Sequence, residues 1–184
     1  MDIPAPSSKV SFKDVVCEIA LLIGSAVLFS LSFPSFLSDW GWFPLAFFAL
    51  FPVFIVIHRS GWVRVCIYGL LYGWLSYALF NYWLLKFHPL AIFIVPTIYA
   101  VFLLILFPFL KLADVLLPDH SFIAQTFIWL GYEFLKTKGF LGYSYGVIGY
   151  TQYLFLPLAR ISALFGVCEF PCWLFSLPRS SAAL

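Results

Sequence analysis

The chain has 184 residues, of which 64% are apolar and 22% aromatic, while only 10% are charged. A soluble domain carries about 25% charged residues, and so few charges cannot cover the surface of a soluble fold of this size. The composition and the mean hydropathy of +1.03 exclude a soluble globular protein. We expect an all-α membrane protein with about six transmembrane helices, since each span needs about 20 apolar residues.

The sequence indicates neither a nucleic-acid-binding surface nor a metal-binding site. The net charge of +2 is small and there is no basic run with interleaved aromatic residues. Cys17, Cys66, Cys168 and Cys172 all lie in apolar stretches, which is typical of buried thiols that pack as small hydrophobes. Cys168 and Cys172 have no histidine near them in sequence, so no zinc site is predicted, and no cofactor is expected.

The first half of the chain divides into a polar tail and three apolar runs. Residues 1–14 form the tail, and residues 15–178 the multi-pass domain. The first span is expected over 15–33 and ends in a turn at Pro34. The second is expected over 40–57, beginning with Trp40 and Trp42 at a water interface, and the third over 62–85.

The second half contains three more apolar runs and an unusual segment. Spans are expected over 90–110, over a shorter 122–136 and over 158–177, with a polar stretch at 111–121. Residues 137–157 are too rich in glycine for a helix and too apolar for a free loop. We expect a re-entrant or interfacial segment there, with its backbone covered by protein or a wet cavity. A short polar tail, 179–184, resembles the end of a truncated or frame-shifted gene.

The distribution of Lys and Arg favours a cytoplasmic N-terminus. In that orientation six basic residues lie inside and four outside. The inner set is Lys9, Lys13, Arg59, Arg64, Lys111 and Arg179, and the outer set is Lys86, Lys136, Lys138 and Arg160.

Among the ionisable residues within predicted spans, Glu133, Lys136 and Glu169 are the ones that need an explanation. Glu133 and Lys136 are one helical turn apart, which fits an i,i+3 ion pair at an interface with Lys136 reaching toward water. The same spacing fits a functional site equally well, because ionisable residues inside a membrane span usually mark a functional site. Glu169 lies in the middle of the last run and needs a partner from another helix or a wet cavity.

Other polar residues give weaker signals. Asn81, Tyr82 and Trp83 end the third span, where a Tyr-Trp pair is typical of an interface anchor. His58, His88 and His120 are expected to be solvated, which argues against a proton relay. Cys168 is predicted in the middle of the membrane, where burial disfavours a thiolate, so it is not interpreted as a nucleophile.

Several motifs nevertheless resemble the membrane domain of bacterial apolipoprotein N-acyltransferases. They occur in the family's order and with nearly its spacing, and they cover about residues 24–177. The motifs are Ser32-Phe33-Pro34 with Trp42-Phe43-Pro44-Leu45, Asn81-Tyr82-Trp83, Glu133-Phe134-Leu135-Lys136, Gly142-Tyr143-Ser144-Tyr145, Gly149-Tyr150-Thr151-Gln152 and Gly166-Val167.

The resemblance implies an inner-membrane enzyme of lipoprotein maturation. Such an enzyme moves a fatty acyl chain from a phospholipid, typically phosphatidylethanolamine, to the α-amino group of a diacylglyceryl-cysteine. In the family, a Glu-Lys-Cys triad in a nitrilase-like periplasmic domain forms the thioester. This chain is expected to lack that domain, so it holds no catalytic residue and alone is expected to be inactive, unless a separate catalytic chain joins it.

The chain also departs from the family in detail. Lys136 replaces an arginine, which weakens any bidentate phosphate clamp. Ser144 and Tyr145 replace Pro-Trp, and Glu169 stands where a small residue is common.

Two classes of function remain open. The first is the N-terminal membrane domain of such an acyltransferase; the alternative is a small non-enzymatic multi-pass protein that binds lipid or a partner chain. A transporter is disfavoured, because no internal repeat is visible. In the first case the candidate residues of a lipid or substrate cavity are Glu133, Lys136, Tyr150, Gln152, Asn81, Tyr82 and Trp83.

Overall fold

A computed structural model describes residues 11–35, 41–138 and 142–153. The described residues form an α-helical bundle. Its helices are α1 (Phe12–Ser32), α2 (Pro44–Ala49), α3 (Phe51–Arg59), α4 (Trp62–Phe80), α5 (Ala91–Leu116) and α6 (Ser121–Lys136). Three short 3-10 helices, η1 (Tyr82–Lys86), η2 (Pro118–His120) and η3 (Ile148–Gln152), complete the described elements.

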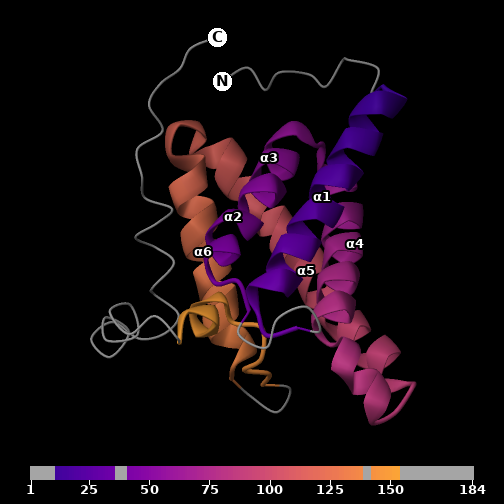
Figure 1. Cartoon of the computed structure of the whole chain (residues 1–184). Helices are drawn as coiled ribbons and strands as arrows, with labels where there is room; N and C mark the ends of the chain where they lie inside the picture. Colours follow the sequence, from indigo (N-terminus) through magenta and orange to yellow (C-terminus); the bar gives the residue numbers. More distant parts are fainter. Residues whose placement is uncertain (1–10, 36–40, 139–141, 154–184) are drawn as a thin grey trace.

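Three of these helices are long and apolar enough to cross a membrane: α1, α4 and α5. They run side by side in Figure 1, with α2 and α3 against α1, and with α6 on the other side of α5. The membrane class expected from composition is therefore supported. Three candidate spans are found among the described residues, where about six spans were expected along the whole chain. The expected sixth span, 158–177, lies outside the described residues.

The expected second span, 40–57, is not among the three candidate spans. The apolar run 40–57 instead gives two short helices, α2 and α3, which meet at Leu50. Pro52 lies in the first turn of α3, where its missing N–H would have no intrahelical acceptor. Hydropathy is continuous across this break, so the apolar pattern could not reveal it.

The polar stretch at 111–121, which was expected to separate two spans, is helical in its first half. Helix α5 continues to Leu116 and carries Lys111 and Asp114 on buried positions. Lys111 Nζ donates to Asp114 Oδ2 at 3.0 Å and to the Ile57 and His58 carbonyls at 3.0 and 3.1 Å. Its charge thus satisfies the free carbonyls at the C-terminus of α3, which lets a polar segment stay helical.

Helices α4 and α5 approach closely at two glycines. An added Cβ at Gly69 would lie 2.6 Å from the Leu103 carbonyl oxygen, and one at Gly73 would lie 2.7 Å from Ala100 Cα. Small residues four apart let membrane helices pack backbone to backbone. This close contact sets the distance between α4 and α5, on which the aromatic contacts of the next section depend.

A third glycine shapes the turn after α1. Gly41 has φ +66°, and a Cβ there would lie 2.7 Å from the Phe33 carbonyl carbon. The Trp42 amide then donates to the Leu31 carbonyl at 3.0 Å. Only glycine fits this left-handed position at low cost, so the turn brings α2 back against α1.

Candidate functional site

The last turn of α6 carries Glu133 and Lys136, which lie inside the bundle. Both are buried, with 1% and 6% of their surfaces exposed. Their ion-pair interpretation is wrong as a direct contact, since their charged atoms are not within 4.0 Å of each other. Lys136 does not extend to water either.

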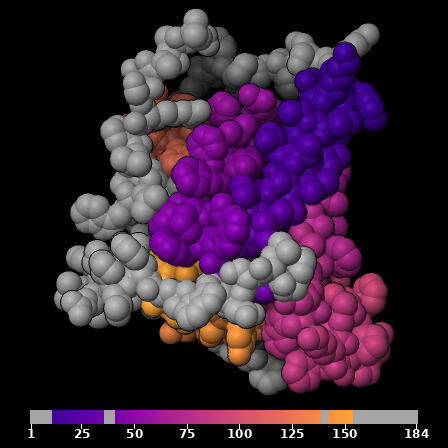
Figure 2. Space-filling model, in the orientation of Figure 1, coloured from indigo at the N-terminus to yellow at the C-terminus, as the bar shows by residue number. Residues whose placement is uncertain are grey.

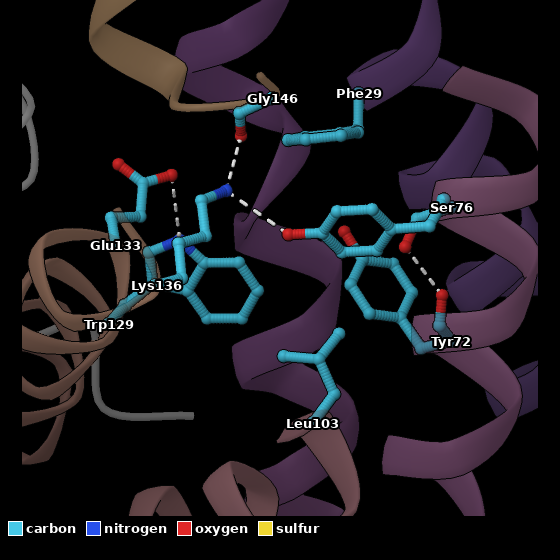
Figure 3. Close-up of a pocket in the computed structure, with 9 residues that line it drawn as sticks. Phe29, Tyr72, Ser76, Leu103, Trp129, Glu133, Lys136 and Gly146 are labelled. Atoms are coloured by element: carbon cyan, nitrogen blue, oxygen red, sulfur yellow. Dashed lines mark hydrogen bonds between the residues drawn. The ribbon is translucent and has the colours of Figure 1, made fainter. Parts of the chain in front are cut away.

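Lys136 joins α6 to α4 and to the segment 142–153. Its Nζ donates to the Tyr77 hydroxyl at 3.1 Å and to the Gly146 carbonyl at 2.8 Å. The ammonium also lies 5.5 Å from the Tyr77 ring centre and 5.8 Å from that of Tyr132, within cation–π range. The buried charge is thus held by a carbonyl, a hydroxyl and two rings. Figure 3 draws its hydrogen bonds to the carbonyl and the hydroxyl.

Glu133 holds the same segment at a second point. Its Oε1 accepts from the Ile148 amide at 3.1 Å and from Trp129 Nε1 at 3.4 Å. Its Oε2 has no hydrogen-bond partner among the described residues. A buried carboxylate that receives an amide from η3 fixes the start of that helix, where backbone N–H groups have no other acceptor.

A third attachment comes from the end of α4. The fully buried Asn81 accepts, through Oδ1, a hydrogen bond from the Tyr143 hydroxyl, and the Tyr143 amide donates to the Lys136 carbonyl at 2.8 Å. Burial raises the pKa of Tyr143 well above its ordinary value, so its hydroxyl stays protonated and available as a donor. Residues 142–153 are therefore attached to both α4 and α6 at one end of the bundle.

A small cavity lies beside Lys136, enclosed by α1, α4, α5 and α6 (Figure 3). It is about the size of one water molecule. The residues that line it are Phe29, Tyr72, Ser76, Tyr77, Leu103, Trp129, Glu133, Lys136 and Gly146. An acyl chain or a headgroup does not fit in this small cavity.

The remaining candidate residues divide into exposed and buried ones. Tyr150 is 45% exposed, while Tyr82 and Trp83 are partly buried. Gln152 is 2% exposed, and neither atom of its amide has a partner in the described part of the chain. Glu169 lies outside the described residues. The structure thus gathers Glu133, Lys136 and Asn81 around one segment and leaves Tyr150 facing outward.

Two contributors to this site, Tyr77 and Tyr99, had no clear signal in the sequence. Tyr77 stacks on Tyr99 with ring centres 4.5 Å apart and planes at 14°, and Tyr99 contacts Tyr143 at 5.2 Å. These residues come from α4, α5 and the segment 142–153. Their contacts depend on tertiary packing, and in a chain with ten tyrosines nothing distinguishes them from interface residues.

The opposite end of the bundle carries two polar clusters. His58 Nδ1 lies 2.8 Å from Asp114 Oδ1, although 68% of the histidine side chain is exposed. Arg64 pairs with the buried Glu18 at 2.8 Å, and the Tyr68 hydroxyl donates to the same carboxylate at 2.6 Å. Since each of these carboxylates is paired, the two clusters neutralise charge within the bundle. Among the described residues no group of three His, Cys, Asp or Glu could hold a metal ion.

Comparison with known proteins gives one family. The profile of the apolipoprotein N-acyltransferase N-terminal domain matches residues 25–176. The chain is 44% identical over 150 residues to apolipoprotein N-acyltransferase 1 of Treponema denticola, and 40% identical over 150 residues to the protein of the same name from Treponema pallidum. Each match covers 82% of this chain and 28% of the relative. No solved structure matches.

Proposed function

The chain belongs to the apolipoprotein N-acyltransferase family, and we propose that it supplies the membrane-embedded part of an enzyme that acylates lipoproteins. In this proposal the acyl donor is a phospholipid such as phosphatidylethanolamine, and the acceptor is the α-amino group of a diacylglyceryl-cysteine. The chain covers 28% of the length of the relatives it matches. We therefore assign the covalent chemistry to a nitrilase-like domain outside this chain.

One observation carries the proposal. Three of the motifs that resemble the family meet at one end of the apolar bundle, although the one at Asn81 lies far in sequence from the two at Glu133 and Tyr143. Glu133 and Lys136 hold the Ile148 amide and the Gly146 carbonyl, and Asn81 holds Tyr143. Motifs that served only to make apolar helices would have no reason to converge on one irregular segment.

The contacts suggest separate roles for the candidate residues. Glu133, Lys136, Asn81 and Gln152 are buried, and we assign them to positioning the segment 142–153. Tyr82, Trp83 and Tyr150 are at least partly exposed, and we assign them to contact with lipid or lipoprotein. Both substrates are lipids, so a rigid surface at the membrane boundary would present them to a catalytic domain outside the bilayer.

We further propose that the chain is multi-pass in the bacterial inner membrane, with its N-terminus in the cytoplasm. Lys13, Arg59, Arg64 and Lys111 lie at the end of the bundle that would face the cytoplasm, against three lysines at the other end: Lys86, Lys136 and Lys138. This agrees with the positive-inside bias. In that orientation the segment 142–153 lies at the outer boundary, and we favour an interfacial position over a re-entrant one because three of its tyrosines are exposed: Tyr145, Tyr150 and Tyr153.

A domain exchange tests the function. The matching 150-residue region of the full-length Treponema denticola protein is replaced by residues 25–176 of this chain, and the purified chimera is supplied with phosphatidylethanolamine and a diacylglyceryl peptide. We expect mass spectrometry to detect the N-acylated peptide. The 184-residue chain alone, in the same mixture, should yield no product.

The control for this experiment is the same full-length protein with the region deleted. A chimera that inserts into membranes as well as the parent but forms no N-acylated product would contradict the proposal. It would favour a non-enzymatic lipid-binding role.

A further inference from the structure

A series of four tyrosine rings runs from the inside of the bundle to the segment 142–153, part of which is seen in orange at the surface of one end of the molecule (Figure 2). The Tyr77 ring of α4 stacks on the Tyr99 ring of α5, and Tyr99 contacts Tyr143 with ring centres 5.2 Å apart and planes at 37°. Tyr143 in turn contacts Tyr145 at 5.4 Å. Tyr99 is buried and Tyr145 exposed, so the series joins the interior to the surface.

Tyr99 contacts the two rings whose hydroxyl groups take part in attaching the segment. The Tyr77 hydroxyl accepts a hydrogen bond from Lys136 Nζ at 3.1 Å, and the Tyr143 hydroxyl donates to Asn81 Oδ1. Aromatic pairs prefer ring centres about 4.5–7 Å apart, and both contacts of Tyr99 lie in this range. In a close-packed interior a shift of either ring therefore changes the contact that Tyr99 makes with the other.

The other described links between the two attachments run through the backbone. The Asn81 amide donates to the Tyr77 carbonyl at 3.0 Å in the last turn of α4, and the Tyr143 amide donates to the Lys136 carbonyl at 2.8 Å. These bonds fix the backbone, but each tyrosine hydroxyl lies at the far end of its ring. The positions of both hydroxyls therefore depend on what packs against the rings, and Tyr99 packs against both.

We propose that Tyr99 is a positioning residue that couples the two attachments, so that the bond from Lys136 to Tyr77 and the bond from Tyr143 to Asn81 strengthen or weaken together. The segment is then held in one orientation, because neither attachment loosens alone. The inference rests on the proposed function only for the reason such an orientation is needed, which is to present substrates to the catalytic domain.

A double-mutant cycle measures this coupling in the purified 184-residue chain in micelles. Tyr77→Phe and Tyr143→Phe each remove one hydroxyl and keep the ring. Hydrogen exchange at the Ile148 amide reports opening of the segment, because Glu133 binds that amide. We expect the double variant to exchange about fivefold more slowly than the product of the two single effects predicts, which corresponds to about 1 kcal/mol, the size of one aromatic contact.

Three backgrounds separate the Tyr99 ring from the backbone links. In the Tyr99→Leu background the difference should disappear, because the ring that contacts both tyrosines is gone. In the Tyr99→Phe background it should remain, because the ring is kept. It should also remain with Phe107→Leu, a matched control on α5, since the Phe107 ring is also buried but contacts Tyr72.

Additive effects of the two hydroxyl substitutions in the wild-type chain would overturn the coupling, whether or not Tyr99→Leu folds. A difference that persists in Tyr99→Leu would also overturn it and would assign the coupling to the backbone links. The exchange measurement contains no substrate, so its outcome is independent of whether the chimera described above transfers an acyl chain.

The positioning role has its own readout in that chimera. Tyr99→Leu should lower kcat about fivefold and leave KM within about twofold, the pattern of an interaction that orients reactants without binding them. Tyr99→Phe should restore the parental kcat, because it restores the ring. An unchanged kcat in Tyr99→Leu, or a loss confined to KM, would contradict the positioning role.

Discussion

The glycine contact between α4 and α5 makes opposite predictions for two similar substitutions. Gly73→Ala should destabilise the bundle, because its Cβ would lie 2.7 Å from Ala100 Cα and 3.1 Å from Leu103 Cβ. Gly24→Ala on α1 should not, because nothing lies within 4 Å of its added Cβ. Both positions are inside candidate spans, so the two variants differ mainly in the space around the new methyl group.

The magnitudes follow from two opposing effects. Overpacking costs about 1–3 kcal/mol, and the upper end applies to Gly73 because the nearest atom belongs to the backbone of α5 and cannot turn away. Replacing a helical glycine by alanine gains about 1 kcal/mol. We expect Gly73→Ala to lower the free energy of unfolding by about 2 kcal/mol, and Gly24→Ala to raise it by up to about 1 kcal/mol.

The assay is unfolding of the purified chain in mixed lipid–detergent micelles by added dodecyl sulfate, followed by far-UV circular dichroism. Tyr77 lies one turn beyond Gly73 and stacks on Tyr99, so Gly73→Ala should also perturb the near-UV signal of the tyrosines. Equal stability of Gly73→Ala and wild type would refute the steric argument. A loss for Gly24→Ala as large as that for Gly73→Ala would refute it equally.

Three further predictions concern charged residues. Lys136→Met should increase hydrogen exchange at the Ile148 amide by tenfold or more, because the segment then loses its bond at the Gly146 carbonyl. Lys136→Arg keeps a donor there, so the Ile148 amide should exchange more slowly in this variant than in Lys136→Met. Equal exchange in the two variants would contradict this. Arg64→Leu should cost about 3 kcal/mol in dodecyl sulfate unfolding, the lower end for a buried pair, since the Glu18 carboxylate loses its cation and keeps only the Tyr68 hydroxyl; Arg64→Leu with Glu18→Leu should recover most of that loss. Glu133→Ala in the full-length chimera should reduce N-acylation without reducing membrane insertion; wild-type turnover would return Glu133 to a purely structural role.

Apolar runs predicted helices well where polar residues bound them clearly. The expected helix at 122–136 corresponds to α6, Ser121–Lys136, and the run 15–33 corresponds to α1, Phe12–Ser32. In both cases a change from polar to apolar residues coincides with a helix end. Membrane spans depend chiefly on this contrast, which is why the helical membrane class could be predicted, whereas the family was predicted from the order and spacing of short motifs.

The errors occur where polar groups are satisfied within the fold. The expected span ended at residue 110 because Lys111 and Asp114 are polar, yet Lys111 pairs with Asp114 and bonds to the end of α3, and α5 continues to Leu116. The break between α2 and α3 went unnoticed for the converse reason, since an apolar run gives no sign of where its backbone bends. A hydropathy value reflects the cost of placing a polar side chain in a membrane. It does not include the hydrogen-bond or ion-pair partner that reduces that cost.

The same limit explains the site. Glu133 and Lys136 are close in sequence, have opposite charge and face the same side of α6, so local reasoning pairs them. In the structure each bonds instead to a segment at least ten residues further along the chain, at Ile148 and Gly146. A direct ion pair would neutralise the two charges but would leave that amide and that carbonyl without partners in a buried site, at a cost of about 1–3 kcal/mol each. When each charged side chain bonds to a backbone group, the buried amide and carbonyl gain partners. The two charges are also still balanced, because the two side chains remain near enough to interact electrostatically. Charged pairs at the end of a membrane helix that precedes a glycine-rich segment are therefore better interpreted as attachments for that segment than as isolated ion pairs.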